Sequence, residues 1–214
     1  MKKILKGSEN LRQSSDVRLP ITKDILSKLV AAVPAIIRNP YNASLLKAMM
    51  SLAYYCFLRI GEIAVKNRQD TQKLFKLMMF ILKKELIKQQ NLLVNLRNFK
   101  HCNGQSKTLL LTMDKSNVIC PVSALLNYLK LAGHSSGPLF QFQEGIPITA
   151  YYFNQHLKLL LQAVGLSSDY YKGHSFMIGA ATSAATRGVP LSVIQHMGRW
   201  KSNAFHHYIR LYNF

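Results

Sequence analysis

The chain is short of acidic residues. Its 214 residues include 9 Asp and Glu against 28 Lys and Arg, which gives a formal net charge of +19. A globular protein this basic needs a polyanionic partner or another explanation for its charge. Nucleic acid is the first candidate, because Lys and Arg that neutralise phosphates release counterions and bind tightly at low salt. A membrane surface is a weaker alternative, and a merely basic soluble protein is the plainest reading of the composition.

Cysteine is also scarce. Cys56, Cys102 and Cys120 are odd in number, widely separated and form no C-x-x-C pair. This spacing argues against a disulfide framework and against a zinc site. A reducing compartment suits such a chain, so we expect an intracellular protein.

Long apolar runs are missing as well. The most apolar stretch, residues 74–87, is interrupted by Lys76, Lys83 and Lys84, so it is too short and too charged to cross a bilayer. The basic start, Met1–Lys3, is followed by no apolar signal core. We therefore expect a soluble protein with no membrane segment. The hydrophobic fraction of 49% is enough for a packed core.

Hydrophobic periodicity predicts a mainly helical chain with one small antiparallel sheet, an α+β class. We expect helices to begin at Thr22, to cover residues 41–65, 122–132, 151–164, 174–187 and 190–198, and to resume at Ser202. Alternating residues from Leu92 to Phe99, a Gly-containing turn and the apolar residues 108–113 predict a hairpin. Residues 66–90 have no clear period. Pro34 and Pro40 are expected to separate the first two helices.

Three features follow one another near the end of the chain. His174 opens a helix of small residues in G-H-S-F-M, a G-R-W corner follows at residues 198–200, and Tyr208 lies in H-H-Y-I-R. Upstream, Arg59 lies in F-L-R-I-G-E. Together these motifs resemble the C-terminal catalytic half of a tyrosine recombinase of the phage integrase family, most similar to versions carried by eukaryotic mobile elements.

The resemblance implies a tyrosine recombinase catalytic-domain fold over residues 18–214, after a basic linker or arm at residues 1–17. The N-terminal core-binding domain that completes a clamp around DNA in such recombinases is expected to be absent. The implied partner is double-stranded DNA, on which copies of the chain assemble. No metal and no cofactor are implied, and the location is the nucleus if the host is eukaryotic.

The same resemblance assigns chemistry to individual residues. Tyr208 becomes the nucleophile that attacks a phosphodiester and forms a phosphotyrosine. Arg59 becomes the first phosphate-clamping Arg, supported by Glu62, and His174 a further phosphate-site residue. Lys100 becomes the hairpin general acid that protonates the leaving oxygen, with Lys107 across the turn as a fallback.

Each of these residues also has an ordinary structural reading. Arg59 and Glu62 lie three residues apart and could form a plain helix-surface ion pair. His174 could be a helix-start hydrogen-bonding residue, and Tyr208 could be amphipathic packing. Any one Lys in so basic a chain is by default a solvated charge.

The G-R-W corner leaves two candidates open. The family places a His or Trp nine positions before the nucleophile, where this chain has Arg199, and Trp200 is eight before it. Arg199 could reach a phosphate by charge and Trp200 through its indole N–H. Trp200 could instead anchor the core.

Met177 is the departure from the family pattern, which has a second Arg at this position. A thioether carries no charge and donates no hydrogen bond. Losing one preorganised contact to a developing oxyanion costs about 10²–10³ in rate. The sequence therefore predicts a recombinase domain whose strand cleavage is impaired. The alternatives are a catalytically inactive DNA-binding protein derived from a mobile-element recombinase, and a basic protein-interaction domain.

Overall fold

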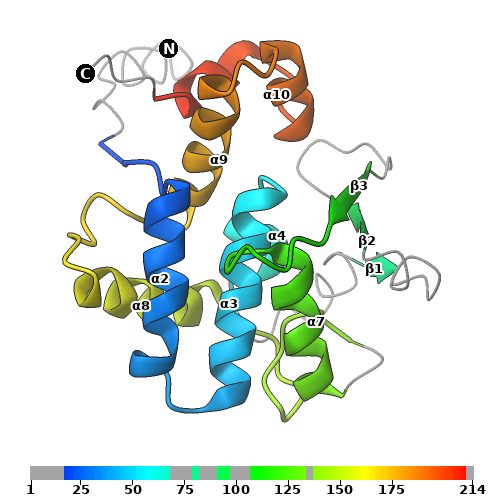
Figure 1. The fold of residues 1–214 in the computed structure, drawn as a ribbon, viewed down its shortest axis with the longest axis vertical. Helices are drawn as coiled ribbons and strands as arrows, with labels where there is room; N and C mark the ends of the chain where they lie inside the picture. Colours follow the sequence, from blue (N-terminus) through cyan, green and yellow to red (C-terminus); the bar gives the residue numbers. More distant parts are fainter. Residues whose placement is uncertain (1–16, 68–78, 82–90, 97–106, 134–136, 211–214) are drawn as a thin grey trace, which may run out of the picture.

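The computed structural model describes residues 17–67, 79–81, 91–96, 107–133 and 137–210 (Figure 1). The elements in chain order are α2 (Lys23–Ile36), α3 (Pro40–Tyr55), α4 (Ile60–Ile63), β1 (Met79–Ile81), β2 (Asn91–Leu96), β3 (Lys107–Thr112), α7 (Pro121–Ala132), α8 (Ala150–Ala163), α9 (His174–Thr186), α10 (Leu191–Met197) and the 3₁₀ helix η1 (Asn203–Tyr208). The expected mainly helical fold with a small antiparallel sheet is confirmed. None of the described helices is both long and apolar enough to cross a bilayer.

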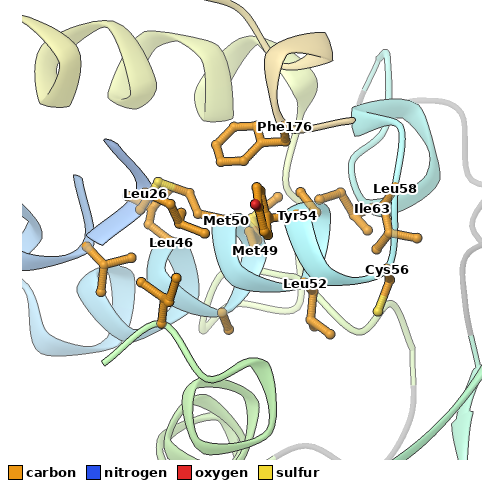
Figure 2. Close-up of a cluster of buried hydrophobic side chains, with 14 of the residues drawn as sticks. Leu26, Leu46, Met49, Met50, Leu52, Tyr54, Cys56, Leu58, Ile63 and Phe176 are labelled. Atoms are coloured by element: carbon orange, nitrogen blue, oxygen red, sulfur yellow. The ribbon is translucent and has the colours of Figure 1, made fainter. Parts of the chain in front are cut away.

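Helix α3 is the centre of the core. Asn39 caps it by accepting a hydrogen bond from the Asn42 N–H at 3.0 Å, and Pro40 occupies the first turn, where a missing N–H costs nothing. Helices α2, α7 and α9 all pack against it. Figure 2 shows Phe176 of α9 lying over Met49 and Met50 of α3. Each fully buried side chain of this size contributes about 1.5–3 kcal/mol, so α3 holds the surrounding elements in place.

The prediction of one helix over residues 41–65 is wrong. Helix α3 ends at Tyr55, and Phe57 adopts a left-handed backbone conformation with φ 52°. The Leu58 N–H then bonds back to the Ala53 carbonyl at 2.9 Å, and the chain turns into the short helix α4. No glycine or proline marks this turn in the sequence, which is why periodicity alone missed it. Arg59 is consequently the N-cap of α4 and not a mid-helix residue.

The other helices begin and end close to the predicted positions. Thr22 caps α2 and Thr149 caps α8 through their side-chain oxygens, and Gly165 follows α8 with a positive φ of 75°. Contrary to the prediction, Pro34 does not end α2. It lies within the last turn of that helix. The strand-like residues 139–142 form only an isolated bridge.

The predicted hairpin is confirmed by the pairing of β2 with β3. The two strands are antiparallel, from Asn91 opposite Thr112 to Leu96 opposite Lys107, and β1 pairs with the other edge of β2. Leu92 and Val94 turn into the core. This register puts Lys107 at the first position of β3. Lys100 falls among residues 97–106, outside the described part of the chain.

Helix α9 lies unusually close to the extended residues that precede α2. A Cβ placed on Gly179 would lie 1.8 Å from the carbonyl oxygen of Ile21, so only glycine fits there. One turn earlier, the Ile21 N–H donates to the Ser175 carbonyl at 3.0 Å. The absence of a side chain at Gly179 thus allows α9 to pack closely against Ile21. Helix α10 and η1 then pack on α9, which brings Tyr208 of η1 to the N-terminal turn of α9.

Candidate functional site

His174 and Tyr208 meet directly although 34 residues separate them in the chain. The Nε2 atom of His174 lies 2.9 Å from the Tyr208 hydroxyl oxygen, and the ring centroids are 5.3 Å apart. His174 is the first residue of α9, and Tyr208 is the last residue of η1. Both side chains are partly buried. When Nε2 carries no proton it accepts the phenolic proton, so the pair has the geometry of a base beside a hydroxyl nucleophile.

Thr182 fixes the backbone around Tyr208. Its Oγ1 donates to the Tyr208 carbonyl at 3.3 Å and accepts from the Arg210 N–H at 3.0 Å. Thr182 lies two turns after His174 on the same helix, so α9 holds both the imidazole and the backbone of its hydroxyl partner. Sequence reasoning missed this residue. The one available signal was a hydroxyl side chain within a run of alanines.

Trp200 packs against the ring of Tyr208, with centroids 4.9 Å apart. Gly198 makes room for it, because a Cβ there would lie 1.6 Å from the indole ring. The Phe57 ring packs edge-on against the same indole, and the Phe205 ring packs against it at a tilt. The buried indole N–H has no hydrogen-bond partner within the described residues. Trp200 therefore belongs to the surroundings of Tyr208 and also to an aromatic cluster.

Glu62 accepts the backbone N–H of Arg59, the N-cap residue, at the start of α4. The Arg59 backbone N–H donates to Glu62 Oε2 at 2.8 Å, and its Nη1 donates to Oε1 at 3.3 Å. The predicted pairing three residues apart is therefore present, and it fixes the carboxylate at the helix N-terminus. The Arg59 side chain retains 21% exposure.

Arg199 reaches the same carboxylate from the other side. Its Nη2 donates to Glu62 Oε2 at 2.8 Å and to the Phe57 carbonyl at 2.9 Å, and its Nη1 donates to the Cys56 carbonyl at 3.1 Å. The side chain is 1% exposed, and the backbone takes a left-handed φ of 58°. Burial lowers the pKa of Arg199, while the negative charge of Glu62 opposes that shift. Burial also raises the pKa of the adjacent Cys56 thiol to about 12, which leaves that thiol protonated.

A basic cavity of about 620 Å³ opens beside these residues. Its lining includes five basic side chains, Arg18, Arg59, Lys158, Lys172 and His174. None of the described residues that line it is acidic, so it favours an anion. A Cβ on Gly173 would lie 2.2 Å from the Ile60 side chain, and this close approach brings the α4 and α9 N-termini to one wall. Arg59 and His174 thus share the cavity, as the resemblance implied.

Lys107 is not among the residues that line this cavity. Its Nζ donates to the backbone carbonyl of His196. Burial, followed by repulsion from Arg199, lowers the pKa of Lys107 to about 8. Sequence reasoning had kept it only as a fallback for Lys100.

Met177 lies one turn after His174 and is completely buried. Its thioether contributes no charge and no donor to the neighbourhood of His174. Within the described residues, no group of three or more His, Cys, Asp or Glu could hold a metal ion.

Solved structures with the same fold are recombinases and integrases. The XerH site-specific recombinase bound to palindromic difH substrate, in a post-cleavage complex, superposes with a TM-score of 0.64 at 15% identity, covering 92% of this chain and 49% of that one. The XerA recombinase gives 0.60 at 17% identity, covering 91% and 61%. The Tn1549 transposon integrase in complex with circular intermediate DNA gives 0.53 at 13% identity, covering 97% and 66%. The chain thus spans about half to two thirds of the length of these proteins.

Sequence comparison identifies a family for the chain but no individual curated relative. No curated protein sequence matches the chain significantly. The family model described as "Phage integrase family" matches residues 21–213, a span that includes Arg59, His174 and Tyr208. The chain belongs to the phage integrase family.

Proposed function

We propose that this domain binds double-stranded DNA and cleaves and rejoins one strand through a phosphotyrosine on Tyr208, with a rate limited by Met177. The observation that carries the proposal is the 2.9 Å contact between His174 Nε2 and the Tyr208 hydroxyl, at the edge of a cavity that Arg59 also lines. Family membership and a net charge of +19 agree with this reading.

The chemistry assigned to these residues is a transesterification. The Tyr208 oxygen forms a bond to phosphorus as its proton passes to His174 Nε2, and the bond from phosphorus to the 5′ oxygen of the next nucleotide breaks. Arg59 donates to the non-bridging oxygens, on which negative charge grows. The departing 5′ oxygen takes a proton from a lysine. Rejoining is the same sequence in reverse, with the 5′ hydroxyl as the nucleophile.

Two lysines are candidates for the leaving-group proton. Lys100 holds the position that the resemblance assigns, in the sequence between β2 and β3. Lys107 is favoured by a separate observation, because a pKa of about 8 is near the operating pH and suits a general acid. Replacing each lysine by Gln in turn distinguishes them. The variant that lacks the general acid should lose cleavage of a normal substrate with a 5′-oxygen leaving group. It should retain cleavage of a substrate with a 5′-sulfur leaving group, which needs no proton.

Met177 accounts for the proposed impairment. A buried thioether cannot replace the guanidinium that the family pattern places there, and the loss of one such contact costs about 10²–10³ in rate. The same observation favours a second function, a catalytically inactive DNA-binding protein that descends from a mobile-element recombinase. Both functions require salt-dependent DNA binding, whereas a protein-interaction domain requires none.

A nicked-duplex trap tests the proposal. A pool of duplexes with random sequence around a nick lets the cleaved fragment diffuse away, so a covalent protein–DNA adduct accumulates. We expect an adduct with the unsubstituted chain and none with Tyr208→Phe. Tyr170→Phe, at an exposed tyrosine, is the matched control and should retain the adduct. Tyr212→Phe tests the other C-terminal tyrosine, which lies outside the described residues.

The outcomes separate the functions. DNA binding without any adduct, even in Met177→Arg, leaves the inactive DNA-binding protein. Absence of DNA binding at low salt removes both. Assembly of copies on DNA is tested by sizing the complex on duplexes of different length, and a nuclear location by imaging the tagged chain in eukaryotic cells.

A further inference from the structure

Glu62 is shared between two arginines that come from distant parts of the sequence. Its Oε2 accepts from Arg199 Nη2 at 2.8 Å and from the Arg59 backbone N–H at 2.8 Å, while its Oε1 accepts from Arg59 Nη1 at 3.3 Å. The carboxylate is therefore held in one orientation, with one oxygen on each guanidinium. A side chain fixed by several hydrogen bonds loses the freedom to swing away from its partners.

The two guanidinium groups differ sharply in their surroundings. Arg199 is 1% exposed and donates to the carbonyls of Cys56 and Phe57 as well as to Glu62. Arg59 is 21% exposed and lines the basic cavity. Only Arg59 of the two is therefore placed to meet a ligand that enters the cavity.

The net charge of Glu62 and its two arginines depends on the buried Arg199. Glu62 alone would cancel the charge of Arg59, since the two are in contact and the carboxylate is only 14% exposed. With Arg199 present, the three side chains sum to one positive charge. In a partly buried site this net positive charge attracts an anion strongly, because Coulomb energies grow as the effective dielectric constant falls.

From this geometry we infer that Arg199 is a positioning residue: it neutralises and orients Glu62 so that the positive charge of Arg59 is left for a phosphate in the cavity. The inference rests on the proposed function, because it takes the ligand to be a phosphodiester. It gives Arg199 a role different from the direct phosphate contact that its sequence position suggested. The left-handed backbone of Arg199 and its carbonyl partners direct its guanidinium inward.

The experiment measures phosphate affinity rather than cleavage. Inorganic phosphate is titrated at low ionic strength into the full chain, and the side-chain Nε–Hε resonance of Arg59 is followed by NMR. The variants are Arg199→Met, Glu62→Gln, and the two together. Arg38→Met, at an exposed arginine on another part of the surface, is the matched control.

We expect Arg199→Met to weaken phosphate binding about tenfold or more, because Glu62 then cancels Arg59. The double variant should recover most of the loss, since it removes the unbalanced carboxylate along with the arginine. Arg38→Met should bind as the unsubstituted chain does. Equal affinity in Arg199→Met overturns the inference. So does a folded double variant that stays as weak as Arg199→Met, because that result assigns Arg199 a purely structural role.

Glu62→Gln keeps the experiment decisive if Arg199→Met does not fold. The charge balance then predicts phosphate binding at least as tight as in the unsubstituted chain, and a clear loss contradicts the inference. If the unsubstituted chain itself shows no phosphate response at Arg59, the proposed function loses its phosphate site, and this inference falls with it. That result differs from the others because it appears before any substitution is made.

Discussion

The candidate site has two halves that differ in completeness. In the nucleophile half, His174 and Tyr208 are hydrogen-bonded, Trp200 backs the Tyr208 ring, and Thr182 fixes the backbone. In the phosphate half, Arg59 lines the cavity, but Arg199 is buried on Glu62.

We propose that Met177 is the reason that the second half is weaker. Its apolar side chain is completely buried, at the position where the resemblance implies a second Arg. On the proposed function, the site keeps its nucleophile and lacks part of its electrophilic support. A Tyr–His pair is held by packing that also stabilises the fold, whereas a phosphate-clamping Arg contributes mainly to function. The second kind of residue can therefore be replaced without losing the domain.

The largest expected effect breaks the nucleophile half. His174→Gln should lower the rate of adduct formation about 10²–10⁴-fold, because the base that receives the Tyr208 proton is lost. Quenched time courses on the nicked duplex measure this rate. His156→Gln is the matched control: that histidine is also partly buried, but it pairs with the Tyr152 carbonyl on α8. An unchanged rate in His174→Gln would show that the 2.9 Å contact is packing and not chemistry.

The next effect repairs the phosphate half. Met177→Arg should raise the rate of adduct formation about 10²–10³-fold by restoring a preorganised donor. The melting temperature should fall at the same time, because a guanidinium replaces a fully buried apolar side chain. Met177→Leu should change neither quantity, since it conserves volume and polarity. If Met177→Arg folds but cleaves no faster, Met177 does not limit the rate.

A smaller effect concerns protonation of the leaving oxygen, and it is measured as the pH dependence of cleavage. If Lys107 is the general acid, its protonated form does the work, so cleavage should fall about tenfold for each pH unit above its pKa of about 8. Lys107→Arg should slow cleavage across the whole pH range, because a guanidinium holds its proton too tightly to give it to the leaving oxygen. The test is the pH profile of adduct formation from pH 6 to 10. A profile that is unchanged in Lys107→Arg returns the role to Lys100.

Much of this arrangement could be predicted from the sequence, for identifiable reasons. The helices around Thr22, Pro121 and Gly165 begin and end where caps and breakers stand, and the β2–β3 hairpin follows from alternating residues. The convergence of Arg59 and His174 on one cavity came from the family pattern and not from periodicity.

What the sequence could not provide depends on close three-dimensional contacts. The left-handed conformation at Phe57 ends α3 without a glycine or proline, because packing overrides local preference there. The inward turn of Arg199 likewise depends on the carbonyls of Cys56 and Phe57, which lie more than 140 residues earlier in the chain. Neither the conformation of Phe57 nor the contacts of Arg199 leave a signal in the neighbouring sequence.

The smallest expected effect sharpens the nucleophile half without touching its reacting groups. Thr182→Val keeps the shape of the side chain but removes the hydroxyl that holds the Tyr208 carbonyl and the Arg210 N–H. We expect a loss of about 1 kcal/mol in the free energy of unfolding and a several-fold slower formation of the adduct, because Tyr208 is then less well aligned with His174. Thr186→Val is the matched control, since the hydrogen bond that the Thr186 hydroxyl donates within the described part of the chain goes to the Thr182 carbonyl of its own helix. Denaturant unfolding gives the stability change, and comparison of adduct rates gives the alignment. Equal rates in the two variants would mean that His174 and the packing of Trp200 are enough to place Tyr208.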